Sequence, residues 1–258
     1  MKKSSILIML LTFVCLCLLA QGKRVLFIGD SITDGGWGNS GGAPMASKDR
    51  NQTDMNHIYG HSYMMLCAAH YQSEYPDSDF QFYNRGIGGN SLYDMARRWK
   101  TDALDLHPDI VSILIGTNDI HYYIDSLAKN PNAKFDIQAW SRQYRQLLDE
   151  LKVQNPKVKI ILGTPFVEKE GWVGNTPTFA LRDSLIRLCA AQVEQIAAEY
   201  QTECLHYNTL FDHLVKTEPR KSYWIWDGIH PTPAGHQRMA DLWISRTDSL
   251  EWLITTKE

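Results

Sequence analysis

Val25-Leu26-Phe27-Ile28-Gly29-Asp30-Ser31 is the segment from which the fold of this chain is most readily inferred. Four consecutive apolar residues that stop at a glycine and two polar residues are typical of a strand buried on both faces and ending in a loop. Such strands belong to parallel sheets that are covered by helices on both sides. The segment therefore predicts an α/β protein in which Ser31 follows the carboxyl end of a buried strand.

Four more strand-like segments follow, and segments with helical periodicity separate them. The predicted strands are residues 80–84, 109–115, 158–162 and 203–207, and the predicted helices are residues 57–75, 91–106, 137–155, 178–200 and 233–252. This alternation predicts one parallel sheet of five strands with helices on both faces. The chain has 258 residues and no visible linker or repeat, so residues 21–258 are expected to form one domain.

The first 20 residues have the pattern of a secretory signal peptide. Lys2 and Lys3 precede an apolar run from Ile6 to Ala20, and a polar break follows, so cleavage is expected after Ala20. The run is short for a membrane span, which disfavours an uncleaved anchor. We therefore expect a secreted or periplasmic protein that does not stay inserted in a membrane after cleavage.

Charge and cysteine content narrow the function classes. The formal net charge is −3, and a nearly neutral chain gives no reason to expect nucleic acid or an anionic membrane as the main partner. Removal of the signal leaves Cys67, Cys189 and Cys204. An odd number allows at most one disulfide within the chain, and buried free thiols are the favoured interpretation. No cysteine spacing indicates a metal site.

Three polar residues predict nucleophilic catalysis. Ser31 stands at the end of a buried strand, where its hydroxyl is expected to be exposed, although a serine there could instead cap a helix. Asp227 and His230 are three residues apart with a glycine between them, so the carboxylate can turn back and orient the imidazole. The other ring nitrogen is then available to a serine hydroxyl. For an isolated pair of this kind, a turn-capping aspartate and a surface histidine are the commoner interpretation.

A serine hydrolase also needs donors for the oxyanion that forms during attack. Gly89 follows the second predicted strand in a glycine-rich turn, where a backbone N–H can approach a ligand closely. Asn118 follows the third strand and offers a side-chain amide. Both are also common turn and loop residues. However, Ser31, Gly89, Asn118 and the Asp227–His230 pair are all expected at the same edge of one sheet.

Four segments together resemble the motif blocks of the SGNH (GDSL) hydrolases, in order and in spacing. They are Ile28-Gly29-Asp30-Ser31, Asn84-Arg85-Gly86-Ile87-Gly88-Gly89, Gly116-Thr117-Asn118-Asp119 and Asp227-Gly228-Ile229-His230-Pro231. The α/β-hydrolase elbow, G-x-S-x-G, is absent. The resemblance implies a flavodoxin-like three-layer α/β/α sandwich and an enzyme that needs neither metal nor organic cofactor.

The resemblance also implies a role for each matched residue. Ser31 would be the nucleophile, His230 the base and Asp227 the residue that orients it. The N–H groups of Ser31 and Gly89 and the amide of Asn118 would form the oxyanion hole. Asp30 and Asp119, which flank these positions, are expected to anchor loops rather than react.

The substrate is less well defined by the sequence. The stretch from Gly35 to Asn56 follows Ser31 and is expected to wall the site. Tryptophans in loop-like segments suit either stacking on sugar rings or plain packing; these are Trp37, Trp172, Trp224 and Trp226. An exported member of this family with these features most resembles a carbohydrate esterase that removes acetyl groups from a polysaccharide. Alternatives are a lysophospholipase or other lipid esterase, a thioesterase, and a catalytically silent carbohydrate-binding protein. His57 and His61 are expected at a helix start or the surface rather than on a metal.

Overall fold

Five parallel strands form the centre of the molecule in a computed structural model that describes residues 22–37, 49 and 57–254. The strands are β1 (Arg24–Gly29), β2 (Gln81–Gly86), β3 (Ile110–Leu114), β4 (Lys159–Gly163) and β5 (Glu203–Leu205). Their order in the sheet is β2-β1-β3-β4-β5, the flavodoxin-like order. The predicted five-stranded α/β fold is confirmed. The predicted signal segment, residues 1–20, lies outside the described residues.

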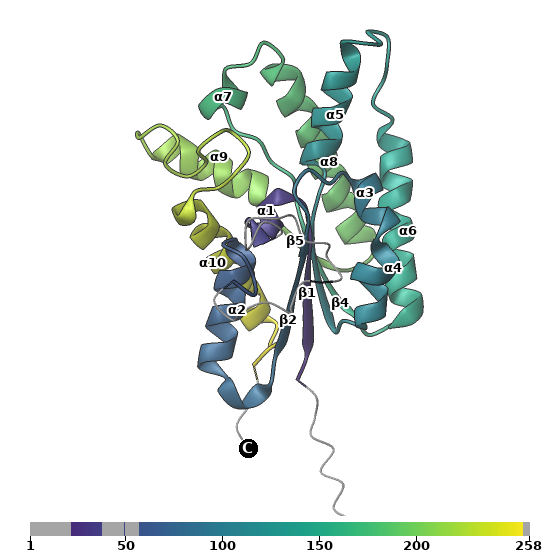
Figure 1. Cartoon of the computed structure of the whole chain (residues 1–258), viewed down its shortest axis with the longest axis vertical. Helices are drawn as coiled ribbons and strands as arrows, with labels where there is room; N and C mark the ends of the chain where they lie inside the picture. The colour runs from purple at the N-terminus through teal and green to yellow at the C-terminus, as the bar shows by residue number, and fades with distance from the viewer. Residues whose placement is uncertain (1–21, 38–48, 50–56, 255–258) are drawn as a thin grey trace, which may run out of the picture.

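Helices cover both faces of the sheet and make the three layers (Figure 1). One layer contains α2 (Tyr63–Glu74), α9 (Tyr207–Thr217) and α10 (Pro233–Ser249), and α2 packs against α10. The other contains α3 (Leu92–Arg97), α4 (Trp99–Asp102), α5 (Thr117–Leu127), α6 (Ile137–Gln154) and α8 (Phe179–Glu199). Two short helices, α1 (Ser31–Asp34) and α7 (Gly171–Gly174), lie near the carboxyl edge of the sheet. Among the described residues, no helix combines the length and the apolar composition that crossing a bilayer requires.

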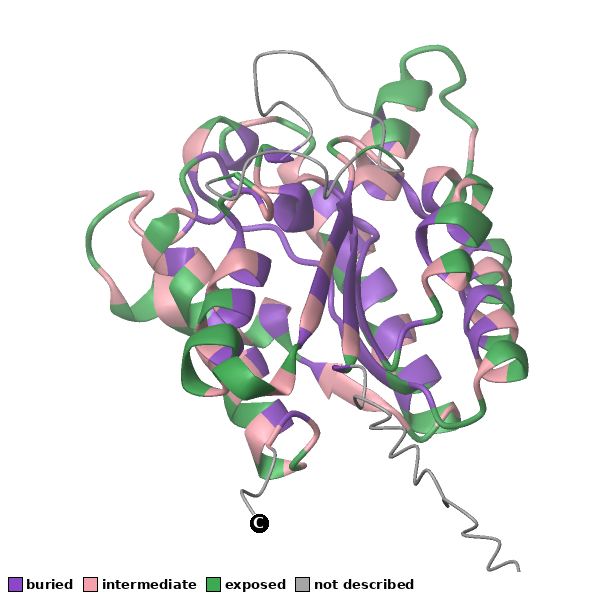
Figure 2. Cartoon of the chain, turned by 60° about the horizontal axis from the view of Figure 1, so that its bottom comes forward, coloured by how far each residue is buried: buried purple, intermediate pink, exposed green. Residues whose placement is uncertain are grey.

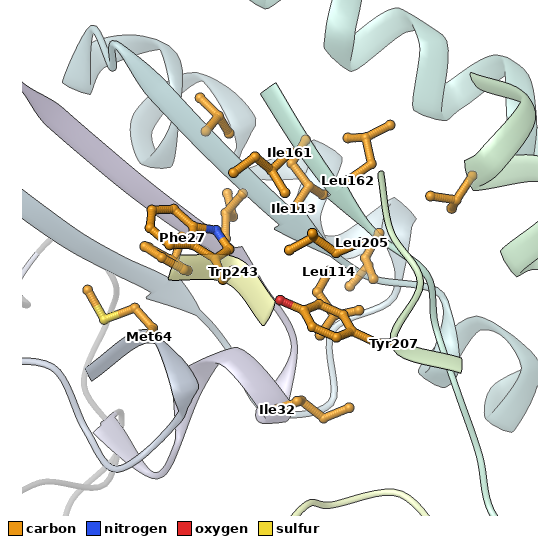
Figure 3. Packing of buried hydrophobic residues seen from close by; sticks show 14 of the residues in the cluster. Phe27, Ile32, Met64, Ile113, Leu114, Ile161, Leu162, Leu205, Tyr207 and Trp243 are labelled. Atoms are coloured by element: carbon orange, nitrogen blue, oxygen red, sulfur yellow. The ribbon is translucent and has the colours of Figure 1, made fainter. Parts of the chain in front are cut away.

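The core is built around β1. All four of its apolar residues, 25–28, have no exposed surface, as expected for a strand with helices on both faces. Figure 2 shows buried residues concentrated along the strands and exposed ones on the outer sides of the helices. Phe27 packs against Trp243 of α10, with ring centroids 4.9 Å apart (Figure 3). The Trp243 indole N–H donates to the buried hydroxyl of Ser112, so this polar group keeps a partner inside the core.

Several predicted element boundaries were wrong. The helix predicted from residue 57 begins at Tyr63, because Ser62 caps it and accepts the Met64 N–H. The helix predicted over residues 91–106 is broken into α3, α4 and the 3-10 turn Leu104–Leu106. The first break is at Arg98, which leaves helical geometry (φ −111°, ψ 6°) while its guanidinium donates to carbonyls of neighbouring strands.

The strand order fixes where a ligand binds. β2 lies on one side of β1 and β3 lies on its other side, so the chain changes direction across the sheet at β1, which is a topological switch point. Ligands of such sheets bind outside the carboxyl ends of the strands at this point. Ser31 follows β1 and Asn118 follows β3, so both lie at the expected place.

Candidate active site

Ser31 is the first residue of α1, directly after β1 and Asp30. Gly29 is required at the strand end, since a Cβ there would lie 2.2 Å from the Leu114 carbonyl oxygen. Asp30 caps the helix and accepts the Ile32 N–H at 3.0 Å. The alternative role of Ser31 as the helix cap is therefore wrong, and its hydroxyl instead meets the ring of His230, with 2.8 Å between Oγ and Nε2.

The Asp227 carboxylate folds back onto its own turn. Its Oδ1 accepts the backbone N–H groups of Ile229 (2.9 Å) and His230 (2.7 Å), and its Oδ2 lies 2.7 Å from His230 Nδ1. Gly228 has φ +101°, and a Cβ there would crowd the carbonyl of Glu170 at 2.7 Å, so glycine suits this turn. The structure thus brings Ser31, His230 and Asp227 into one hydrogen-bonded series.

Charge within this series is organised for proton transfer. The hydrogen bond to Asp227 raises the pKa of His230 above its usual value, against the opposing effect of burial. Burial works to raise the pKa of Asp227, but the bonds it accepts from His230 and Ile229 lower it below the usual value. The ionised carboxylate can only accept, so Nδ1 carries the proton. Nε2 is left as the acceptor for the Ser31 hydroxyl.

Asp30 directly precedes Ser31 in the chain and is almost fully buried. Burial raises its pKa to about 7, and the Ile32 N–H and the nearby His230 charge oppose that shift. Its hydrogen bond to the helix backbone supports the anchoring role expected from the sequence. The charge state of Asp30 also affects His230, because an ionised Asp30 raises the pKa of that imidazole.

Helix α5 holds the loop that carries Gly89. Tyr122 donates its hydroxyl to the Gly89 carbonyl at 2.6 Å. Asn118, one turn earlier, donates its side-chain N–H to the Asn90 carbonyl at 3.1 Å. Both oxygens of Asp119 accept the Leu92 N–H at 3.1 Å, which is the loop-anchoring role expected of this residue.

Gly89 itself has φ +80°, a conformation that favours glycine. The neighbouring Gly88 lies close to Ser31, since a Cβ there would be 3.9 Å from Ser31 Cβ. Asn118 uses one of its two amide N–H groups on Asn90, and the other has no hydrogen-bond partner among the described residues. The structure thus brings the Gly89 loop and Asn118 to the same edge of the sheet as Ser31.

Three residues that support this edge were not identified from the sequence. Arg98 donates to the carbonyls of Gly29 (3.1 Å) and Arg85 (2.7 Å), at the ends of β1 and β2. Asn84, fully buried within β2, donates to carbonyls at the end of α1. Tyr122 holds Gly89 as described. The only sequence signal was the glycine-rich turn after Asn84, because the partners are distant along the chain.

The tryptophans differ in environment. Trp226 and Trp172 are each 57 % exposed, and the Trp226 ring lies nearly parallel to that of His230, with centroids 6.3 Å apart. Trp37 is fully buried, so the possibility of an exposed stacking residue is wrong for this position. Trp224 is half-buried against the core. Residues 38–48 and 50–56 of the stretch expected to wall the site lie outside the described residues.

The other histidines and cysteines singled out in the sequence are not part of this hydrogen-bonded series. His61 precedes α2, as expected for a helix-start position, and its ring contacts that of His57 edge-on. In the part of the chain that the structure describes, no three histidine, cysteine, aspartate or glutamate side chains are arranged to hold a metal ion. Cys67 and Cys189 are buried free thiols, as expected, and Cys204 is a free thiol that is only half-buried.

Known proteins resemble this chain along nearly its whole length. The sequence model of the GDSL-like lipase/acylhydrolase family matches residues 27–238. An acetylxylan esterase from Geobacillus stearothermophilus is 31 % identical over 239 residues, which are 91 % of this chain and 98 % of the relative. The crystal structure of an acetylxylan esterase from the same organism superposes with a TM-score of 0.69 over 87 % of this chain and 94 % of that chain, at 29 % identity.

Two further findings extend this comparison. An α/β hydrolase enzyme from the metagenome of Lake Arreo, Spain, has a TM-score of 0.69 and 26 % identity, over 89 % of this chain and 97 % of that chain. Structures described as catalytic mutants of the Geobacillus esterase replace a serine, an aspartate and a histidine by alanine. The aspartate and histidine replaced there are three residues apart in that protein.

Proposed function

Because the chain belongs to the GDSL-like lipase/acylhydrolase family, we propose that it is a serine esterase that removes small acyl groups, chiefly acetyl, from carbohydrate. The observation that carries this proposal is the unbroken series from the Ser31 hydroxyl through the His230 ring to the Asp227 carboxylate, with contacts of 2.8 and 2.7 Å. A hydroxyl, an imidazole and a buried carboxylate in this order are the parts of a serine hydrolase.

The first half of the reaction forms an acyl-enzyme. Nε2 of His230 takes the proton of Ser31 as Oγ attacks the ester carbonyl carbon. Asp227 keeps the ring oriented and stabilises the imidazolium that results. Collapse of the tetrahedral intermediate breaks the bond to the alcohol oxygen, and the alcohol leaves with the proton that His230 now carries. Ser31 retains the acyl group.

The second half regenerates the enzyme. Water gives a proton to His230 Nε2 and attacks the acyl carbonyl, and Ser31 leaves with that proton. In both halves the oxyanion would be held by the N–H groups of Ser31 and Gly89 and by the Asn118 amide. A single donor of this kind is worth about 3 kcal/mol in the transition state. Helix α5 supports this role because it fixes the Gly89 loop through Tyr122 and Asp119.

Two observations support a carbohydrate ester as substrate. The relative that covers 91 % of this chain is an acetylxylan esterase. The exposed indole of Trp226 stands beside the base, where a flat apolar face can stack on a sugar ring that carries the ester. The acyl group is proposed to be small on the basis of the same relative.

The test is a series of esters assayed with wild type, Ser31→Ala and the control Ser73→Ala, which removes an exposed hydroxyl on α2. Wild type and the control are expected to release acetate from acetylated xylan and to hydrolyse nitrophenyl acetate faster than long-chain nitrophenyl esters. Ser31→Ala is expected to lose activity on all of them. A preference for long chains would indicate a lipid esterase, and binding of xylan without hydrolysis would indicate a silent carbohydrate-binding protein.

A further inference from the structure

A hollow of about 380 Å³ lies beside the turn that carries Asp227. Its lining includes Lys169, Glu170, Trp172, Asn175, Lys221 and Ser222. None of these residues belongs to the Ser31–His230–Asp227 series or to the proposed oxyanion hole. The chemistry at Ser31 therefore does not account for this feature.

The wall of the hollow touches the Asp227 turn through the backbone. Gly171, which begins α7, has φ +54°, and a Cβ there would lie 2.4 Å from the Asp227 Cα. The Val173 N–H donates to the Asp227 carbonyl at 3.1 Å. Trp172 lies in the chain between Gly171 and Val173 and is therefore held beside the turn that also carries His230.

Trp172 presents a large apolar face to solvent, with 57 % of its surface exposed. An indole lining a polar hollow combines a flat apolar surface with nearby hydrogen-bonding groups. A pyranose ring is complementary to that combination, because its C–H faces are apolar and its hydroxyl groups are both donors and acceptors. A fatty acyl chain has no groups that could form hydrogen bonds with this polar lining.

The polar lining is held in place by a buried carboxylate. Glu170 is only 7 % exposed, and its carboxylate accepts the N–H and the hydroxyl of Ser222 at 2.8 and 3.3 Å. Lys221 is 88 % exposed and its Nζ lies 4.0 Å from the same carboxylate. Lys169 adds a second exposed ammonium group. Lysine and glutamate are depleted at the cores of protein–protein interfaces, which argues against a second copy of the chain as the occupant.

We propose that this hollow is a sugar-binding subsite, in which a pyranose ring stacks on Trp172 while an acetylated sugar of the same chain occupies the site at Ser31. The subsite rests on the proposed carbohydrate esterase function. It makes the enzyme favour oligosaccharides or polysaccharides over small esters, because only a chain of sugars reaches both places.

The experiment measures the ratio of kcat/KM for acetylated xylo-oligosaccharides to kcat/KM for nitrophenyl acetate. Stacking of aromatic faces is worth up to about 1.5 kcal/mol, so Trp172→Ala is expected to lower this ratio by about tenfold, mainly through KM. Trp172→Phe keeps an aromatic face and is expected to restore most of it. The matched control is Trp252→Ala, which removes an indole that Lys159 contacts at the start of β4, at the opposite edge of the sheet.

An unchanged ratio in Trp172→Ala, or an equal fall in Trp252→Ala, would overturn the subsite. A change in sedimentation coefficient confined to Trp172→Ala would also overturn it, by showing that the indole is a contact between subunits. If wild type releases no acetate from any acetylated carbohydrate, the proposed function itself fails, and the subsite with it. These outcomes are distinguishable because the wild-type assay is read first.

Discussion

Removal of the Asn84 side chain should loosen the connection between the end of β2 and the helix that begins with Ser31. Asn84 has no exposed surface. Its amide nitrogen donates to the carbonyls of Thr33 (3.0 Å), Asp34 (3.2 Å) and Tyr59 (2.8 Å), and its oxygen accepts the Gly86 N–H (2.9 Å). The three carbonyls share the two N–H groups of the amide, and the Asn84→Ala substitution deletes all of these contacts.

The magnitude follows from these contacts. A hydrogen bond contributes about 1 kcal/mol to stability. The two amide N–H groups and the oxygen of Asn84 make about three full hydrogen bonds at once, so the expected loss is about 3 kcal/mol. The carbonyl of Thr33 keeps the hydroxyl of Ser62 as a partner at 2.7 Å. Because Thr33 and Asp34 belong to α1, kcat should fall as well.

Urea unfolding followed by tryptophan fluorescence measures the free energy, and nitrophenyl acetate hydrolysis measures kcat. Asn84→Asp is a matched variant of nearly the same shape. It directs a carboxylate oxygen at three carbonyls, so its loss should be larger at pH 7 than at pH 5, where protonation of the buried carboxyl is favoured. A loss below about 1 kcal/mol in Asn84→Ala would refute the reasoning.

Three further predictions concern the site and its supports. Tyr122→Phe removes the hydroxyl that donates to the Gly89 carbonyl. The Gly89 N–H should then be held less firmly and stabilise the oxyanion less, so kcat for nitrophenyl acetate should fall about three- to tenfold with KM nearly unchanged. An unchanged kcat would contradict this. His230 must be neutral to act as the base, and its pKa is raised, so the acid limb of the pH profile of kcat/KM should lie above the usual pKa of histidine. Asp227→Asn should move that limb to lower pH and reduce kcat by roughly 10³–10⁴-fold. An acid limb that does not move would contradict the pairing of His230 with Asp227. Burial lowers the pKa of His236 to about 4, and its Nδ1 accepts the Tyr63 N–H, so the unfolded chain takes up a proton that the folded chain does not. The contribution of His236 to stability is therefore complete above pH 6.5 and is lost as the pH falls toward 4. The free energy of unfolding should fall between pH 6.5 and pH 4 by about 1–2 kcal/mol less in His236→Gln than in wild type. Equal pH dependence of the unfolding free energy in wild type and variant would count against this.

Local sequence pattern was sufficient for the strands and for the place of Ser31. The run from Val25 to Ile28 is fully apolar because both faces of β1 are buried, and that pattern is visible without a structure. The Asp227–His230 contact was predictable because both groups lie within one turn. Short-range geometry of this kind is encoded by neighbouring residues.

Features that depend on distant contacts were not predictable. Helix α5 begins with the polar residues Thr117, Asn118 and Asp119 and was not predicted, although it buries Thr117, Ile120 and Ile124 on one side. Trp37 lies next to a polar stretch yet is fully buried, because packing against other segments determines its exposure. The roles of Tyr122 and Arg98 arise only when the loop after β2 meets α3 and α5, and nothing in their neighbouring residues signals that contact.

The most direct measurement is covalent labelling with a fluorophosphonate, which reacts only with a serine whose hydroxyl is activated by an adjacent base. Intact mass and peptide mapping of wild type are expected to show a single adduct on Ser31, formed more slowly in His230→Ala and absent in Ser31→Ala. An adduct at another residue, or full labelling of the Ser31→Ala protein, would contradict the assignment of the nucleophile.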